Sequence, residues 1–372
     1  MIKLFFCGDI VNRKTINNSI IDEKLIEIIR KHDIKCCNFE APIVNNPDIN
    51  KINKIGPTVY QTEETGQNII DIGFNLFSIA NNHIMDYGID GLKNTLKFFE
   101  KYNVIGAGIT KEKAYDVYRY EKENVKISFL SIAENGFGAC IKENDYGYAW
   151  MQDPIVEKII KSEKRDVDFL IINCHAGAEM FSYPLPEIKE LYKKFIDWGA
   201  DIIIGHHPHV IQGYENYKKG TIFYSLGNFI FDTMQERKCQ ISYAVSINIK
   251  NNNEYYYEII PCKYEKEVVA MCNENIEKDI IKFSAILNTS QYYDEIDEFC
   301  NKSYNEIYKK YYEAVCGIST YTIKSKLKSC IKIILNKNKF DDLFLYHNIG
   351  IETHLWICNR ALKNLIGEKK YE

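Results

Sequence analysis

The amino-acid sequence predicts an α/β protein, with a large N-terminal domain and a helical C-terminal extension. Up to about residue 250, short apolar runs typical of buried strands alternate with amphipathic helical segments. From about residue 274 onward helical periodicity dominates, and glycine and proline become rare. Strands separated by helices indicate a sheet that is covered on both faces. We therefore expect one domain over residues 1–265 and a helical extension over residues 266–372.

Seven strand-like runs and five helical segments make up the expected core. The strands are Lys3–Cys7, Lys35–Phe39, Leu76–Ala80, Ile127–Ile132, Asp168–Cys174, Asp201–Ile204 and Thr221–Ser225. The helices are Glu23–Lys31, Glu63–Ile72, Gly91–Tyr102, Pro154–Glu163 and Leu185–Trp198. Two alternating segments follow, Cys239–Ile249 and Glu254–Pro261, and the polar residues between them predict a hairpin turn.

Composition argues against several classes of protein. The chain has 372 residues, of which 46% are hydrophobic, so a mainly disordered chain is disfavoured. A formal net charge of −4 provides no basic field that would attract nucleic acid or anionic lipid. No apolar run approaches the ~20 residues that a membrane-spanning helix needs. We expect a cytoplasmic protein that has no transmembrane segment and does not bind nucleic acid.

The twelve cysteines do not form a disulfide or zinc-binding pattern. They are scattered from Cys7 to Cys358, and several, such as Cys36 and Cys37, lie in apolar strand-like runs. No C-x-x-C pair occurs, so neither a zinc knuckle nor a thioredoxin-like redox pair is indicated. We expect buried, reduced thiols, which are typical of a reducing compartment.

Polar side chains suited to metal binding follow the expected strands, at the points where those strands end. The segments are Cys7-Gly8-Asp9, Asn38-Phe39-Glu40, Asn81-Asn82-His83, His175, His206-His207-Pro208-His209 and Gly227-Asn228. The carboxyl ends of strands in an open α/β sheet share one edge, so these segments should converge on one site. Taken singly, several also fit structural roles, such as a helix N-cap for Asp9 or a core histidine for His175.

The residue types at these positions predict a centre with two divalent ions. Carboxylates, an amide oxygen and imidazoles are ligands suited to Mn, Fe or Zn. Either Asp9 or Glu40 is a candidate for the carboxylate that bridges the two ions. Such a pair can lower the pKa of a bound water and clamp the oxygens of an in-line displacement. His207 and His209 can face neighbouring ions from an extended backbone, a conformation that Pro208 favours at His207.

His83 is a candidate general acid and not a metal ligand. Asp86 follows three residues later, close enough to orient the imidazole that would protonate a leaving oxygen. The alternative role for Asp86 is to cap the helix expected to begin near Gly88. Glu179 and Asn228 are candidates for contacts either to the ligand side chains or to the substrate.

Several motifs, in the order in which they occur, match a known family over about residues 2–235. They are Cys7-Gly8-Asp9, Asn38-Phe39-Glu40, Ala80-Asn81-Asn82-His83, Asp86-Tyr87-Gly88, Gly106-Ala107-Gly108, His175-Ala176-Gly177-Ala178-Glu179, His207-Pro208-His209-Val210 and Tyr224-Ser225-Leu226-Gly227-Asn228-Phe229. This set resembles the bacterial capsule-synthesis CapA family. That family includes proteins of poly-γ-glutamate synthesis and belongs to the calcineurin-like metallophosphatase superfamily.

The resemblance implies a four-layer α/β/β/α sandwich with a two-metal centre at the sheet edge. By this analogy the metal ligands are Asp9, Glu40, Asn82, His175, His207 and His209. His83 would be the acid, supported by Asp86. The sequence departs from the wider pattern at Val11, where many metallophosphatases outside the CapA branch carry histidine. It also departs at Ala176, where the family commonly has an aromatic residue, and it shows no counterpart of the membrane anchor of many members.

Three functional hypotheses follow from the resemblance. The first is metal-dependent hydrolysis of a phosphate ester or related bond, in a cell-surface polymer or a phosphorylated small molecule. The second keeps the ions but cleaves an amide bond, such as a γ-glutamyl linkage. The third is a non-catalytic component of a capsule-assembly complex, in which the C-terminal helices bind a protein partner.

Overall fold

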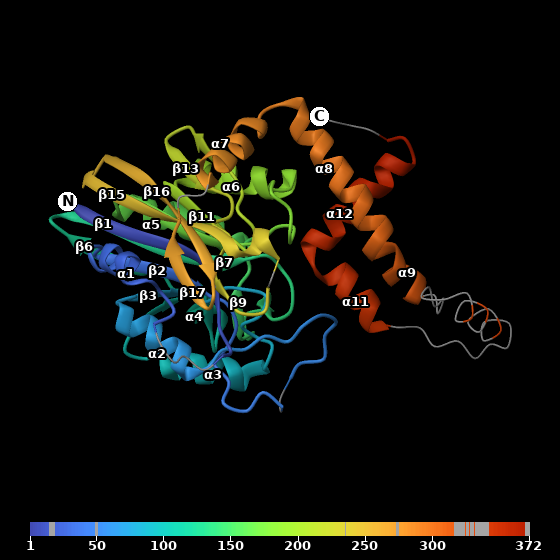
Figure 1. Ribbon diagram of the computed structural model, residues 1–372, viewed down its shortest axis with the longest axis horizontal. Coiled ribbons are helices and arrows are strands. Elements are labelled where there is room, and N and C mark those ends of the chain that lie inside the picture. The colour runs from blue at the N-terminus through green and yellow to red at the C-terminus, as the bar shows by residue number, and fades with distance from the viewer. Residues whose placement is uncertain are drawn as a thin grey trace. The chain divides into compact units, whose positions relative to one another are not determined.

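Two β-sheets stacked face to face form the framework of the first part of the chain (Figure 1). The computed structural model describes residues 1–14, 19–48, 51–234, 236–272, 275–315 and 342–368, together with Lys324, Leu327 and Ile331.

The larger sheet has the strand order β17-β16-β15-β1-β2-β3-β4, and β14 also pairs with β1. Strands β1 to β4 and β14 are parallel, whereas β15, β16 and β17 are antiparallel to their neighbours. The bounds are β1 (Ile2–Val11), β2 (Ile34–Phe39), β3 (Leu76–Ser78), β4 (Asn103–Ile105), β14 (Asn228–Phe231), β15 (Ile241–Asn251), β16 (Glu254–Glu265) and β17 (Val268–Met271).

The second sheet has the strand order β12-β13-β11-β10-β7-β6, with parallel strands at its centre and antiparallel strands at both edges. The bounds are β6 (Tyr118–Lys122), β7 (Val125–Ala133), β10 (Phe169–His175), β11 (Ile202–His206), β12 (Tyr214–Tyr217) and β13 (Gly220–Phe223). A small third sheet contains β5 (Ala107–Gly108), β8 (Ala139–Cys140) and β9 (Gly147–Ala149).

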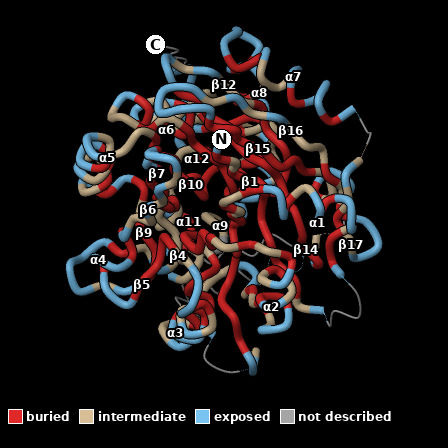
Figure 2. The backbone as a smooth tube through the Cα atoms, turned by 90° about the vertical axis from the view of Figure 1, so that its left-hand side faces the viewer, coloured by how far each residue is buried: buried red, intermediate tan, exposed pale blue. Residues whose placement is uncertain are grey.

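Alternation along β1 shows how the layers are stacked. Leu4 and Phe6 belong to the core cluster between the sheets, which they share with Ile127 of β7. The intervening Phe5 belongs to the cluster on the other face, together with Leu25 of α1 (Glu23–Arg30). Helices α2 (Glu63–Ile72) and α3 (Gly88–Phe98) contribute to that same cluster. Figure 2 shows the central strands of the two sheets, such as β1 and β10, as buried.

The second sheet is covered by two helices, α5 (Pro154–Asp166) and α6 (Pro186–Trp198). Helix α5 contacts β10, and Ile196 of α6 lies against Gly220 of β13. The order helices, sheet, sheet, helices confirms the four-layer α/β/β/α sandwich that the sequence predicts.

Local sequence signals explain why the helices start and stop where they do. Thr62 accepts a hydrogen bond from the backbone N–H of Thr65, which caps the start of α2. Gly73 ends that helix in a conformation with φ of 122°, which favours glycine. Helix α2 therefore has the bounds predicted from the sequence. The predicted hairpin is also present, as β15 and β16.

The domain boundary lies further along the chain than the residue 265 expected from the sequence. The first compact unit comprises Met1–Ile52 and Thr58–Asn288, and the second comprises Asn53–Pro57 and Thr289–Glu372. Strand β17 pairs with β16 and so extends the larger sheet past residue 265. Helix α7 (Ile276–Ile286) then contributes Ile276 and Ile280 to the core between the sheets.

Within the described residues, the second unit is helical, as the sequence predicts for the extension. Its helices are α8 (Ser290–Ser303), the π-helical turn Tyr304–Tyr308, α9 (Lys309–Val315), α11 (Asp342–Gly350) and α12 (Glu352–Leu365). Helices α8 and α12 pack together, with an ion pair of 3.7 Å between Asp297 and Arg360. That these helices bind a protein partner stays a prediction.

No helix in the described ranges has both the length and the apolar character that a bilayer-crossing segment requires. The buried cysteines Cys7, Cys36, Cys37 and Cys174 are thiols, as the sequence predicts.

A close approach between β1 and the turn before β14 depends on Gly8. A Cβ atom at Gly8 would lie 1.7 Å from the carbonyl oxygen of Gly227. The next residue, Asp9, donates its backbone N–H to that same carbonyl at 3.1 Å. The absence of a side chain at Gly8 therefore allows the close approach that places Asp9 beside the turn before β14.

Replacing Gly8 by alanine should force β1 away from Gly227, because the clash is with backbone atoms that cannot rotate aside. We expect Gly8→Ala to lower the free energy of unfolding by about 1–3 kcal/mol, measured by urea denaturation. Gly350→Ala is the control, since a Cβ there meets nothing within 4 Å. Equal stability of Gly8→Ala and the wild type would contradict the close approach.

Candidate metal centre

The carboxylate of Glu40 lies at the centre of the candidate site. Glu40 follows β2 directly, its side chain is fully buried, and neither carboxylate oxygen has a hydrogen-bond partner among the described residues. Three imidazole Nε2 atoms surround Oε1: those of His175 at 3.8 Å, and of His83 and His209 at 3.9 Å. These distances are too long for hydrogen bonds. A buried carboxylate held in this way needs a positive charge close by.

Asp9 lies beside Glu40, near the end of β1, and is also fully buried. Its Oδ2 is 3.6 Å from Nδ1 of His209 and accepts a hydrogen bond of 3.3 Å from the backbone N–H of His207. Its Oδ1 accepts a hydrogen bond of 2.7 Å from the amide of Asn38. The fold thus holds Asp9 among strand ends from both sheets, and not at a helix N-cap.

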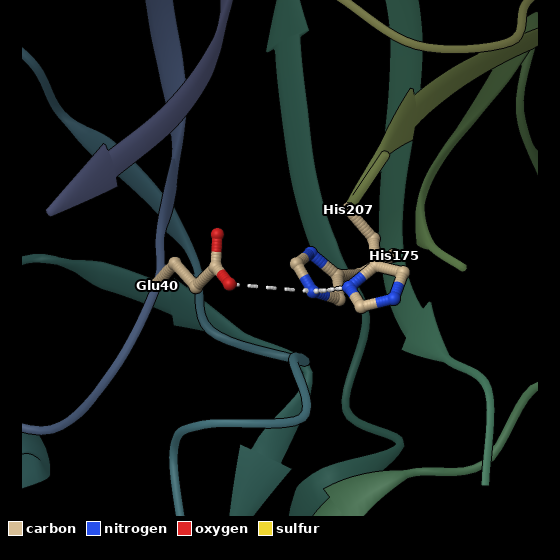
Figure 3. A group of neighbouring side chains, drawn as sticks. All are labelled: Glu40, His175 and His207. Carbon is tan, nitrogen blue, oxygen red and sulfur yellow. Dashed lines mark hydrogen bonds and ion pairs between the residues drawn. The ribbon is translucent and has the colours of Figure 1, made fainter. Parts of the chain in front are cut away.

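A second group of ligand atoms converges on the other side of Glu40. Nε2 of His175 is 3.1 Å from Nδ1 of His207 and 3.0 Å from Oδ1 of Asn82. Figure 3 shows Glu40 facing the imidazoles of His175 and His207. His175 ends β10 and His207 follows β11, whereas Glu40 and Asn82 follow strands of the other sheet.

Two overlapping groups of metal-capable side chains therefore meet at Glu40. One group is Asp9, Glu40 and His209, and the other is Glu40, His175 and His207; within each, the ligand atoms lie within 4.8 Å of one another. Atoms bound to one ion at about 2.0–2.2 Å each lie no more than ~4.4 Å apart. Membership of both groups makes Glu40, and not Asp9, the side chain placed to bridge two ions.

Glu179 and Asn228 occupy the periphery of the site. Glu179 is exposed and can form a third group with His207 and His209. Asn228, the first residue of β14, places its Oδ1 2.9 Å from Nδ1 of His209. Asn228 therefore orients a ligand, while Glu179 lies toward solvent.

The backbone at His207 is not extended, contrary to the expectation based on Pro208. His207 has φ of 94° and His209 has φ of 59°, both in the region that side chains other than glycine rarely adopt. The hydrogen bond from the His207 N–H to Asp9 helps to hold this conformation. Packing at the site therefore overrides the local preference, and the strain is concentrated at two candidate ligands.

His83 and Asp86 form the pair that the sequence predicts. Nδ1 of His83 lies 2.7 Å from Oδ2 of Asp86, and the same carboxylate oxygen accepts the backbone N–H of Val59 at 2.7 Å. The alternative, that Asp86 caps helix α3, is wrong, because Tyr87 occupies the N-cap position and no side chain caps that end. Nε2 of His83 consequently faces Glu40 and the centre.

Three further residues contact the candidate ligands. Asn38 places its amide nitrogen 3.1 Å from Nδ1 of His175, as well as on Asp9. The buried His206 has Nδ1 3.3 Å from Oδ1 of Asp9. The buried Glu134 has Oε1 3.6 Å from Nε2 of His207. Glu134 directly follows β7, so the rule of polar residues after strands would have found it.

The pKa values of the two carboxylates are shifted in opposite directions, because their neighbours differ. Burial raises the pKa of Glu40 well above its usual value, and the charge on His209 only partly offsets this effect. Burial also tends to raise the pKa of Asp9, but the neighbouring imidazoles of His206 and His209, 3.3 Å and 3.6 Å away, hold it well below its usual value. Asp9 is thus stabilised as an anion, whereas the anionic form of Glu40 is not.

The pKa values of the imidazoles are also shifted in opposite directions. Burial lowers the pKa of His175 well below its usual value and that of His207 to about 4. Burial also acts to lower the pKa of His209, but Glu40 and Asp9 together raise it to about 10. His175 and His207 are therefore neutral near pH 7, the state in which imidazole binds metal ions.

A two-sheet α/β/β/α sandwich with carboxylate and histidine ligands clustered between the strand ends is a metallophosphatase-like protein. The chain belongs to the family described as bacterial capsule synthesis protein PGA_cap, whose model matches residues 3–233. This match confirms the resemblance to the CapA family seen in the sequence.

Two relatives show how far the similarity extends. The chain is 32% identical over 267 residues to the PGA biosynthesis protein CapA of Bacillus subtilis (strain 168), covering 70% of this chain and 68% of that protein. It is 31% identical over 247 residues to the capsule biosynthesis protein CapA of Bacillus anthracis, covering 64% and 60% respectively. The chain thus spans about two thirds of the length of these relatives.

Similarity to solved structures is weaker. A novel phosphatase from Mycoplasma pneumoniae aligns with a TM-score of 0.44 and 12% identity, over 76% of this chain and 98% of that one. A 5'-nucleotidase from Candida albicans SC5314 aligns with a TM-score of 0.40 and 12% identity, over 82% and 58%. Similarity at this level is too weak to support the family membership, which is shown by the family match.

The raised pKa of His209 predicts a pH dependence of stability in the metal-free protein. Because the folded state holds this proton more tightly than the unfolded chain, the stabilisation is fully present below about pH 6.5 and lost as the pH rises to about 10. The difference in unfolding free energy between wild type and His209→Gln should therefore shrink across that range. Urea denaturation of both proteins at a series of pH values measures this difference. A difference that does not change with pH would contradict a raised pKa of His209.

Proposed function

We propose that this protein is a metal-dependent hydrolase that uses two divalent ions to cleave a phosphate ester or related bond in bacterial surface-polymer metabolism. The observation that carries the proposal is the buried carboxylate of Glu40, whose oxygens lack hydrogen-bond partners in the described structure while three imidazole nitrogens lie within 4 Å of one of them. The ions would be Mn, Fe or Zn, given the mixed oxygen and nitrogen ligands.

The residues present fit two ions. Asp9, Glu40 and His209 would hold one ion, and Glu40, Asn82, His175 and His207 the other. Two positive ions would compensate the carboxylates that burial leaves uncompensated, which explains why Glu40 is placed without a hydrogen-bond donor. When bound, such ions supply Lewis acidity that polarises the electrophile and stabilises developing negative charge.

His83 would supply the proton for the leaving group. Asp86 fixes the imidazole through Nδ1 and is itself held by the backbone N–H of Val59. Nε2 remains directed at the centre, 3.9 Å from Glu40, where it can carry and deliver a proton. The side chain of His83 is only 8% exposed, so bulk water competes little for that proton.

The names of two relatives support the choice of substrate class. The two CapA relatives are named for capsule and PGA biosynthesis, which favours a cell-surface polymer or a phosphorylated precursor as substrate. Their names also favour a second candidate, hydrolysis of an amide bond such as a γ-glutamyl linkage, since two ions polarise a carbonyl as well as a phosphoryl oxygen. Product analysis after incubation with each class of polymer separates the two.

A leaving-group series tests the role of His83. With Mn²⁺, we expect His83→Ala to lower kcat on an alkyl phosphate ester by about 10²–10⁴-fold. The loss should be much smaller on a p-nitrophenyl ester, because nitrophenolate leaves without a proton. His207→Ala should abolish both activities by removing a ligand, whereas the remote, buried His32→Gln should change neither.

Equal activity of wild type, His83→Ala and His207→Ala would rule out this mechanism. A loss in His83→Ala that is the same for both esters would show that His83 does not act as the acid.

A further inference from the structure

The loop that follows β7, residues Glu134–Gly136, contacts both histidine ligands of the second group and passes close to Asn82. The backbone N–H of Glu134 donates to the carbonyl of His175 at 3.1 Å, and its Oε1 lies 3.6 Å from Nε2 of His207. A Cβ built on Gly136 would lie 3.8 Å from Cβ of Asn82. One short segment thus adjoins His175, His207 and Asn82.

The two ring nitrogens of His207 face different partners. Nδ1 lies 3.1 Å from Nε2 of His175, on the side where the ligand atoms of the second group converge. Nε2 lies on the opposite side, toward Glu134. The geometry therefore assigns Nδ1 as the metal-binding atom and leaves Nε2 to carry the proton.

A carboxylate beside Nε2 would fix which nitrogen of the His207 ring carries the proton. A histidine that binds a metal through one nitrogen usually donates the other N–H to a carboxylate or carbonyl, which fixes the tautomer and strengthens the ligand. Glu134 is only 2% exposed, so its charge is poorly screened by water. His207 also adopts a strained backbone, so its ring position depends on such contacts more than usual.

In the first group, which is Asp9, Glu40 and His209, the histidine has different neighbours. Nε2 of His209 faces Glu40, and its Nδ1 lies 2.9 Å from the neutral amide oxygen of Asn228. The carboxylate beside His207 is not itself a candidate ligand, whereas His209 has the amide of Asn228 and, at 3.6 Å, the candidate ligand Asp9, so a change at Glu134 would affect the second group alone.

We propose that Glu134 is a positioning residue that orients His207 with Nδ1 toward the second ion and thereby sets the affinity of that ion alone. This inference rests on the two-ion centre of the proposed function, but not on hydrolysis.

Zinc titration of the metal-free 372-residue chain tests this proposal. Calorimetry should resolve two binding steps in the wild type. Glu134→Ala should weaken one step by about 10–100-fold and leave the other unchanged. Glu134→Gln, which keeps an acceptor oxygen, should lie between Glu134→Ala and the wild type. Glu163→Gln, which changes a buried glutamate bonded to Arg119 and Ser128 instead, should leave both steps unchanged.

A second readout is independent of affinity. In zinc-loaded protein, ¹⁵N–¹H spectra of the His207 ring should show a proton on Nε2 and none on Nδ1. Wild-type affinities in Glu134→Ala, or a proton on Nδ1, would overturn the proposal. An equal weakening of both steps, with lower thermal stability of the metal-free protein, would also overturn it by showing a structural role.

The outcomes separate this inference from the proposed function. Two zinc ions with the predicted selective loss, but no hydrolysis of any ester or amide, would contradict the function and leave the role of Glu134 standing. Fewer than two zinc ions in the wild type would overturn both.

Discussion

The burial of two carboxylates side by side is the constraint on which the rest of this site depends. Asp9 and Glu40 are both fully buried, and a pair of buried negative charges is strongly unfavourable without compensation. Asp9 accepts hydrogen bonds from Asn38 and from the backbone N–H of His207, but Glu40 has only imidazole nitrogens at distances beyond hydrogen bonding. Cations at the two ligand groups would supply the positive charge that the protein alone does not. The surrounding strands hold the ligands in position for such cations.

The fold provides that frame by bringing the carboxyl ends of parallel strands from two sheets to one place. Carboxylates come from the larger sheet, through β1 and β2, and imidazoles come from the second sheet, through β10 and β11. Glycines without room for a Cβ, such as Gly8, let the backbones approach closely enough for this convergence. The stacking of the sheets is thus as necessary to the site as the ligands themselves.

Much of the fold and most of the site could be predicted because the relevant signals are local. Helix α2 has both a capping threonine and a terminating glycine, so its limits are visible in the sequence. Glu40, which directly follows an apolar strand, and Asp9, near the end of another, were visible for the same reason. Strand β17 was missed because four residues after a short turn carry little pattern, and this omission displaced the predicted domain boundary.

The remaining differences come from tertiary contacts that no local rule contains. The conformation of His207 opposes the preference of a residue before proline, because a hydrogen bond to Asp9, almost two hundred positions away in sequence, helps to hold it. The contact between Asn38 and His175 likewise joins two sheets, and appears only when they are stacked.

Elemental analysis of the purified 372-residue chain, beside Glu40→Gln, is the decisive experiment for the two-ion centre. We expect two Mn, Fe or Zn ions per wild-type chain and a loss of both when the shared carboxylate becomes an amide. A wild type that binds no metal, or a Glu40→Gln variant that retains two ions, would contradict it.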